Sequence, residues 1–231
     1  MSDEELEADA PLLARLYRER FSEDDLDFKR RMWVVLCQRV FQRYVSTTDT
    51  LLDLGAGSCE FTNAIHAGHK IAVDLNPDTA RHAGDARFVQ APGTDLSPIS
   101  SGSVDVIFCS NFLEHLADKG EVLQTLSECR RILRAGGKLL IIQPNIRYLP
   151  GRFWDYFDHH TPLTHLSLVE ALRLAGFVPL EVVPRFLPYT VKGSRLPKST
   201  LLLKAYLRLP IVWPIFGRQM LITAEPDWEA Q

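Results

Sequence analysis

The chain has 231 residues, 46% of them hydrophobic and 24% charged, with a formal net charge of -3. These values suit one globular domain with a full core and argue against a strongly basic nucleic-acid-binding protein. The acidic N-terminus has no apolar signal region, and no apolar run approaches the ~18 residues of a membrane span, so we expect a soluble cytoplasmic protein without a transmembrane segment.

Two helices are predicted before the first strand, over residues 3–20 and 23–45. Ser22 to Asp25 resembles a helix start, and apolar residues recur near helical spacing from Phe28 to Tyr44. Residues 1–48 therefore form either a lid over a ligand or helices packed on the edge of the sheet, and the sequence leaves both interpretations open.

Short apolar segments then alternate with helical patterns. Strands are expected at 50–54, 70–74, 86–90, 104–109 and 137–143, and helices near 59–67, 77–83 and 117–134. The alternation predicts an α/β fold with a Rossmann-like doubly wound sheet that is mostly parallel and covered by helices on both faces. Ser167 to Glu170 reads as a capping box that opens a further helix, which ends at Ala175-Gly176.

The first predicted strand ends in a glycine turn, Asp53 to Gly57, where Gly55 and Gly57 let the backbone approach a ligand closely. About 20 residues on, the second strand ends in Asp74, which can accept hydrogen bonds from both hydroxyls of a ribose or cap the next helix. A dinucleotide-binding loop would carry a third glycine, but Glu60 stands there and would repel a diphosphate. S-adenosylmethionine has a sulfonium cation and no phosphate, so we favour it as the ligand.

At these residues the chain resembles the class I S-adenosylmethionine-dependent methyltransferases, whose first motif reads much like Leu52 to Gly57. The resemblance continues through Ser103–Phe108, Asn111–Leu116 and Leu133–Leu139, and covers roughly residues 50–145. It implies methyl transfer to a hydroxyl, or an amine, of a small or lipid- or glycan-linked metabolite. A nicotinamide-dependent oxidoreductase and a non-catalytic S-adenosylmethionine-binding partner protein are the alternatives.

The resemblance also implies where the cofactor binds. The candidate residues are Asp53, Gly55, Ala56 and Gly57 in the first loop, Asp74 and Leu75 after the second strand, Gly93 and Thr94 after the third, and Asn111 after the fourth. Pro92 stands where the family usually places an acid for the adenine amino group. Adenine contacts are therefore expected from the backbone of Gly93 and Thr94, or from Asp95 after a shift in register.

Methyl transfer needs proximity and orientation, together with a base if the nucleophile is a hydroxyl. The candidates for such a base are Glu114 and His115 after the fourth strand, and His159, His160 and His165 in an aromatic loop after the fifth. We favour His160, because methyltransferases often place a histidine just ahead of the helix that opens here at Ser167. Packing against the aromatic side chains of the loop is the structural alternative.

A divalent cation is another alternative at this site. Some relatives hold one with a Glu-x-x-Glu-His segment and a later histidine, whereas this chain reads Asn111-x-x-Glu114-His115. Glu114, His115 and His160 could still offer three ligands. Because an amide replaces the first carboxylate, we predict no metal.

The resemblance implies that the last two strands, at 177–183 and 218–224, pair antiparallel. The insertion between them, 184–217, is far longer than a common loop. It carries only basic charges, at Arg185, Lys192, Arg195, Lys198, Lys204 and Arg208, interleaved with apolar and aromatic residues. The sequence leaves several roles open for this insertion: binding an anionic or lipid-linked acceptor, peripheral contact with a membrane, binding nucleic acid, or serving as a lid or homodimer contact. We therefore expect one domain over residues 1–231, with its core at residues 49–183 and 218–231.

Overall fold

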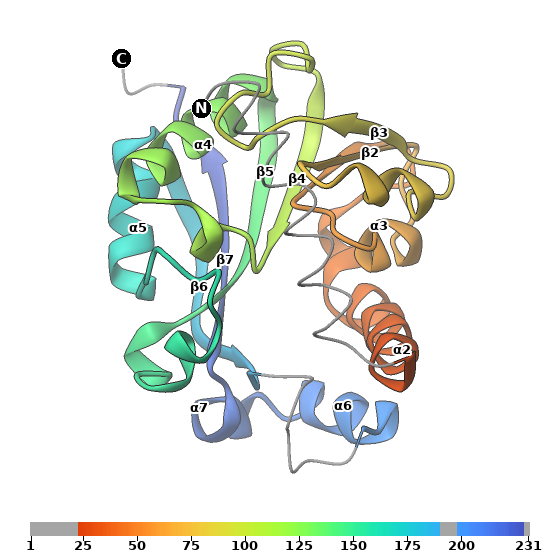
Figure 1. Ribbon diagram of the computed structural model, residues 1–231, viewed down its shortest axis with the longest axis vertical. Coiled ribbons are helices and arrows are strands. Elements are labelled where there is room, and N and C mark those ends of the chain that lie inside the picture. Colours follow the sequence, from red (N-terminus) through yellow and green to blue (C-terminus); the bar gives the residue numbers. More distant parts are fainter. Residues whose placement is uncertain (1–22, 190–197, 229–231) are drawn as a thin grey trace.

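The alternating apolar segments form one seven-stranded sheet within residues 23–189 and 198–228, the part of the chain that the computed structural model describes (Figure 1). The strands are β1 (Thr50–Leu54), β2 (His69–Asp74), β3 (Arg87–Gln90), β4 (Val104–Ser110), β5 (Leu133–Pro144), β6 (Phe177–Leu187) and β7 (Gln219–Pro226). Their order is β3-β2-β1-β4-β5-β7-β6, and β7 runs antiparallel to both of its neighbours. The predicted Rossmann-like sheet with an antiparallel last strand is confirmed.

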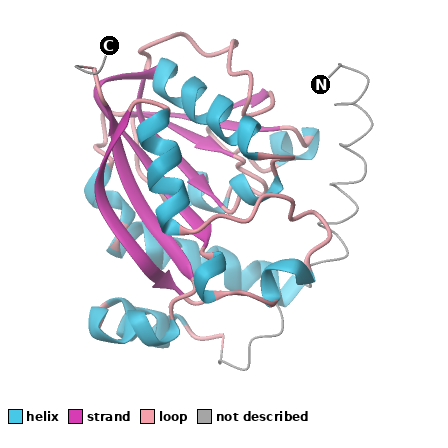
Figure 2. Cartoon of the chain, turned by 90° about the vertical axis from the view of Figure 1, so that its left-hand side faces the viewer, coloured by secondary structure: helices cyan, strands magenta, loops and turns pink. Residues whose placement is uncertain are grey.

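Helices cover both faces of the sheet (Figure 2). The α-helices are α2 (Glu23–Arg39), α3 (Glu60–Ala64), α4 (Lys119–Ile132), α5 (His165–Leu174), α6 (Thr200–Leu207) and α7 (Trp213–Phe216). Short 3-10 helices lie at η1 (Phe41–Tyr44), η2 (Pro77–Arg81), η3 (Leu113–His115), η4 (Ile146–Tyr148), η5 (Arg152–Asp155) and η6 (Pro210–Val212). One core cluster packs α4 and α5 on one face, and another packs α2, η1 and α3 on the other.

The central strands supply both clusters because successive side chains of a strand point to opposite faces. In β4, Ile107 and Cys109 join the cluster under α4, whereas Val106 and Phe108 join the cluster under α2. The ring of Phe108 stacks on Phe61 of α3 at 3.6 Å. Strands buried on both faces explain why the sequence shows continuous apolar runs rather than an alternating pattern.

Several helix boundaries differ from the prediction. The helix expected over 23–45 ends at Arg39 and resumes as η1, and the helix expected over 59–67 shortens to α3. The helix expected to open at Ser167 begins at His165, because Thr164 is the N-cap. Thr164 Oγ1 accepts the Ser167 N–H at 3.1 Å while Ser167 Oγ accepts the Thr164 N–H at 2.9 Å, so Ser167 is the third helical residue of a capping box.

The predicted N-terminal helix, the sixth strand and the insertion differ in how far the structure describes them. The helix expected over 3–20 and the basic residues Lys192 and Arg195 lie outside the described residues. The strand expected at 177–183 continues to Leu187. The predicted insertion folds partly into α6, η6 and α7, which lie together at the lower end of the molecule in Figure 1.

Candidate active site

A cavity of about 470 Å3 opens at the carboxyl ends of the parallel strands. The glycine turn and the polar residues of the cavity wall include Asp53, Gly55, Ala56, Gly57, Ser110, Asn111, Glu114, His115 and His159. Its apolar wall comes from α2, from α6 and from the segment that precedes β7, with Phe28, Met32, Trp33, Leu202, Tyr206 and Phe216 among the contributors. The cavity therefore joins the predicted cofactor loop to the predicted catalytic region within one space.

The glycine turn after β1 is held in a form that requires glycine. Gly55 has φ +71°, and a Cβ there would lie 2.6 Å from Cδ2 of Phe112. The Gly57 N–H donates to Asp74 Oδ2 at 2.7 Å, and the Asn76 N–H donates to Asp74 Oδ1 at 2.8 Å. Asn76 caps the following η2, so Asp74 is not the helix cap of the alternative interpretation. Its carboxylate instead ties the glycine turn to the end of β2.

Asp53 brings a buried carboxylate to the same turn. Burial, together with the charges of Asp74 and Glu60, raises its pKa to about 7, although a 2.5 Å hydrogen bond from the Thr62 hydroxyl opposes the rise. Glu60 forms an ion pair with Lys29 of α2 at 3.1 Å, which links α2 to the loop. A cation that entered the cavity would therefore favour the ionised form of Asp53.

The helix α2 is fixed to the core and also walls the cavity. The ring of Trp33 lies edge-to-face against Phe61 and Phe108, with centroid separations of 5.7 and 5.6 Å. Phe28 and Met32 face the cavity from the same helix. The helix α2 therefore packs on the core and also lines the cavity, and its role as a lid over a ligand stays a prediction.

The predicted cofactor residues divide into two groups. Asp53, Gly55, Ala56, Gly57 and Asn111 line the cavity, whereas Asp74, Leu75, Gly93 and Thr94 do not. A Cβ at Gly93 would lie 2.7 Å from Cζ of Phe112, so the Phe112 ring stands between Gly93 and the glycine turn. The Thr94 carbonyl accepts the Gln124 amide at 3.0 Å. The expected adenine side is closed by Phe112 in this structure.

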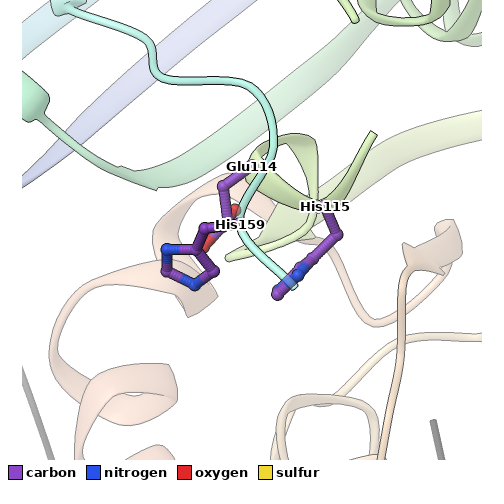
Figure 3. A group of neighbouring side chains, drawn as sticks. All are labelled: Glu114, His115 and His159. Carbon is purple, nitrogen blue, oxygen red and sulfur yellow. The ribbon is translucent and has the colours of Figure 1, made fainter. Parts of the chain in front are cut away.

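Three chemically reactive side chains meet beside the cavity: Glu114, His115 and His159, called here the histidine cluster (Figure 3). A carboxylate oxygen of Glu114 and one ring nitrogen of each histidine all lie within 4.8 Å of one another. These ligand types suit a divalent cation as well as acid–base chemistry. Sequence reasoning had placed His160 in this set of three.

The backbone explains why His159 takes that place. The N–H groups of His160 and Thr161 both donate to the Glu114 carbonyl, at 2.8 and 3.1 Å, and pin the loop to η3. In this arrangement the His159 side chain is buried and stacks on Tyr156 at 4.9 Å. The His160 side chain is exposed and does not line the cavity. The structure therefore places His159, and not His160, in the histidine cluster.

His115 is oriented by the same loop. Its Nδ1 lies 2.8 Å from the carbonyl oxygen of Asp158 and 3.3 Å from the Asp158 carboxylate. Because a carbonyl oxygen can only accept, Nδ1 carries the hydrogen and the neutral ring keeps its lone pair on Nε2. The ring of His159 lies edge-on to His115 with a centroid separation of 5.1 Å, which fixes it further.

A carboxylate oxygen of Glu114 lies within 4.8 Å of a ring nitrogen of each imidazole, and Glu114 is 1% exposed. Burial raises its pKa, and the adjacent His115 only partly offsets the rise. Within the described part of the chain its Oε2 has no hydrogen-bond partner. A positive charge on His115 would stabilise the ionised form of this carboxylate.

His165, the remaining candidate of the loop, has a structural environment. Its Nδ1 lies 3.0 Å from the Asn145 amide nitrogen, and its ring stacks on Tyr148 at 6.1 Å. Burial and then the nearby Arg147 lower its pKa. The cavity lining does not include this side chain.

The known proteins that this chain is similar to are methyltransferases. Residues 52–141 match a family model described as a methyltransferase domain. A probable S-adenosylmethionine-dependent methyltransferase from Mycolicibacterium smegmatis is 31% identical over 186 residues, which span 76% of this chain and 68% of the relative. A human thiol S-methyltransferase, TMT1B, is 44% identical over 100 residues, 38% of this chain and 40% of that protein.

A solved structure shares the fold. A putative methyltransferase from Haloferax volcanii, determined in complex with the Trm112 methyltransferase activator, superposes with a TM-score of 0.65. The match covers 90% of this chain and 95% of that chain at 21% identity.

Proposed function

Because the chain belongs to the S-adenosylmethionine-dependent methyltransferases, we propose that its acceptor is a hydroxyl, or an amine, of a small or lipid- or glycan-linked metabolite. The observation that carries the proposal is the cavity, since the glycine turn and His115 both line it. Proximity and orientation are most of what methyl transfer requires from a protein. The apolar wall suits an acceptor with an apolar part.

The glycine turn fits S-adenosylmethionine. The positive φ of Gly55 forms the tight turn at the cavity, and Asp74, fixed by the Gly57 N–H, has lone pairs left for ribose hydroxyls. Asp53 would offer a buried carboxylate to the positively charged end of the ligand. When bound, the cofactor supplies a methyl group activated on a sulfonium sulfur. All of these cofactor residues, with Leu75, Gly93, Thr94 and Asn111, remain predictions, and adenine contacts near Gly93 require the Phe112 ring to shift.

His115 would act as the general base. Its Nε2 lone pair would accept the proton of the acceptor hydroxyl as the oxygen attacks the methyl carbon. The resulting imidazolium would be stabilised by the Asp158 carboxylate, 3.3 Å from Nδ1, and by the nearby Glu114 carboxylate. The Asp158 carbonyl, together with the edge-on His159 ring, would hold the imidazole in the reactive orientation.

A thiol is the second candidate acceptor. The human relative is named as a thiol S-methyltransferase, and a base beside the cavity would also deprotonate a thiol. The protein should therefore be incubated with methyl-labelled S-adenosylmethionine and with an alcohol, an amine and a thiol on the same long alkyl chain. Short-chain versions of the three compounds are the matched controls.

We expect label in the long-chain alcohol or amine and much less in its short-chain control. Label in the thiol alone would contradict the hydroxyl or amine acceptor and favour the second candidate. If calorimetry shows cofactor binding but none of the three classes is labelled, a different acceptor chemistry is required.

A further inference from the structure

Bulky apolar side chains are exposed on the two segments, 152–157 and 198–216, that also contribute residues to the cavity wall. We call the following set the apolar rim: Trp154, Phe157, Leu201, Leu209, Ile211 and Ile215. Ile211 is 83% exposed and Phe157 is 85% exposed. Leu202 and Phe216 are also exposed, and both line the cavity. The rim is thus continuous with the cavity wall.

Packing of the core does not account for the rim. Leu203, Tyr206 and Leu207 of α6 pack against the core cluster under α2, at the spacing of one helix face. The Tyr206 hydroxyl donates to the Phe186 carbonyl at 2.6 Å, which fixes that face to β6. Leu201 lies outside this stripe and is 74% exposed. An exposed apolar patch of this kind marks an interaction surface.

The two segments of the rim are held in place by the fold. Arg185 of β6 donates to the carbonyls of Gly217 and Ile215, at 3.0 and 2.8 Å, and so fixes α7. Tyr156, in the loop that carries Trp154 and Phe157, meets Tyr189 edge-on at 6.0 Å. The rim is therefore a preformed surface rather than a set of unrelated side chains.

Charge indicates what this surface contacts. Residues 184–217 contain six basic residues and no Asp or Glu. Lys198 pairs with Asp25 at 2.5 Å, whereas Lys204 and Arg208 have no ion-pair partner among the described residues. A second copy docked symmetrically would bring the same basic segments face to face, which costs free energy. An anionic surface with an apolar interior would pair with the basic residues and would also bury the apolar rim.

We propose that the apolar rim, with Lys204 and Arg208, docks the protein on the surface of an anionic lipid bilayer. No described helix is long and apolar enough to span a membrane. Side chains on short helices can instead insert to the depth of the headgroups and upper acyl chains, while basic residues pair with anionic headgroups. The cavity mouth would then open toward the lipid phase. Entry of an acceptor by this route rests on the proposed function, whereas docking itself does not.

The test is co-sedimentation with vesicles of equal parts phosphatidylcholine and phosphatidylglycerol, compared with vesicles of phosphatidylcholine alone, without cofactor or acceptor. We expect binding to the anionic vesicles that weakens as salt is added. Ile211→Glu should weaken it at least about tenfold. Leu174→Glu, at a position 72% exposed on α5 and outside the rim, is the matched control and should bind as the unchanged protein does.

Neutralising the charges tests the same surface without touching an apolar residue. Lys204→Gln combined with Arg208→Gln should weaken binding to anionic vesicles about 25-fold, since each basic residue near such a surface contributes about fivefold. Equal binding by the Ile211 and Leu174 variants would overturn the proposal. So would self-association in sedimentation velocity that Ile211→Glu abolishes while vesicle binding is absent. Cofactor affinity, measured by calorimetry, reports separately on the proposed function.

Discussion

The buried carboxylate of Asp53 should make cofactor affinity depend on pH. Burial raises its pKa to about 7 in the free protein. The cofactor carries positive charge, so its binding should favour ionised Asp53 and lower that pKa. Protonation of Asp53 then competes with cofactor binding, and affinity should fall as the pH drops through 7.

The size of the effect follows from the two protonation states. Between pH 8 and pH 6 the free protein goes from about one-tenth to about nine-tenths protonated at Asp53, so affinity should fall about tenfold, or roughly 1.4 kcal/mol. At pH 7 binding should release about half a proton. Asp53→Asn keeps the shape of the side chain, including an oxygen that can accept from Thr62, and removes the titration.

Calorimetry at both pH values, in buffers with different ionisation enthalpies, measures the affinity and the proton release together. The amino group of the cofactor also titrates in this range, but it does so equally for the protein and for the Asp53→Asn variant. The difference between the two proteins isolates Asp53. If both lose the same affinity between pH 8 and pH 6, Asp53 does not face the cationic part of the ligand.

Three further results are expected. Asp74→Ala should weaken S-adenosylmethionine binding by roughly 1–3 kcal/mol in calorimetry, because it removes charge-assisted hydrogen bonds to ribose; unchanged affinity would leave Asp74 as a purely structural link between β2 and the glycine turn. Gly55→Ala should lower the free energy of unfolding by more than Gly102→Ala, measured by denaturant titration, because both glycines have positive φ but only Gly55 faces the Phe112 ring. A chelator should leave turnover unchanged; a loss that added divalent cation reverses would assign the histidine cluster to metal binding.

Much of the fold could be predicted because its signals are local. Apolar runs separated by helical patterns predict a parallel sheet, and the turn at Gly55 and Gly57 locates the first strand end. A helix boundary is hard to predict where two nearby residues can both serve as the N-cap. Thr164 and Ser167 are both capable N-caps, and the bonds they exchange favour the earlier one.

The candidate site depended on contacts that are distant in sequence. His159 and His160 are equivalent in the sequence, and the Glu114 carbonyl, which binds the His160 N–H, decides which side chain faces inward. The Lys29–Glu60 ion pair likewise joins α2 to the glycine turn across 31 positions, which no local pattern reports. The fold, and not the sequence, shows that Leu203, Tyr206 and Leu207 form the inward stripe of α6 and leave Leu201 exposed.

The most direct test of the account is a comparison of His115→Ala with His160→Ala, using transfer of labelled methyl from S-adenosylmethionine to the best acceptor of the alkyl-chain panel. The account predicts that His115→Ala lowers turnover about 10²-fold while cofactor affinity is retained. His160→Ala should leave both quantities nearly unchanged, because its side chain is exposed and outside the cavity. Full turnover by the His115 variant, or its loss in the His160 variant with cofactor affinity intact, would contradict the central claim.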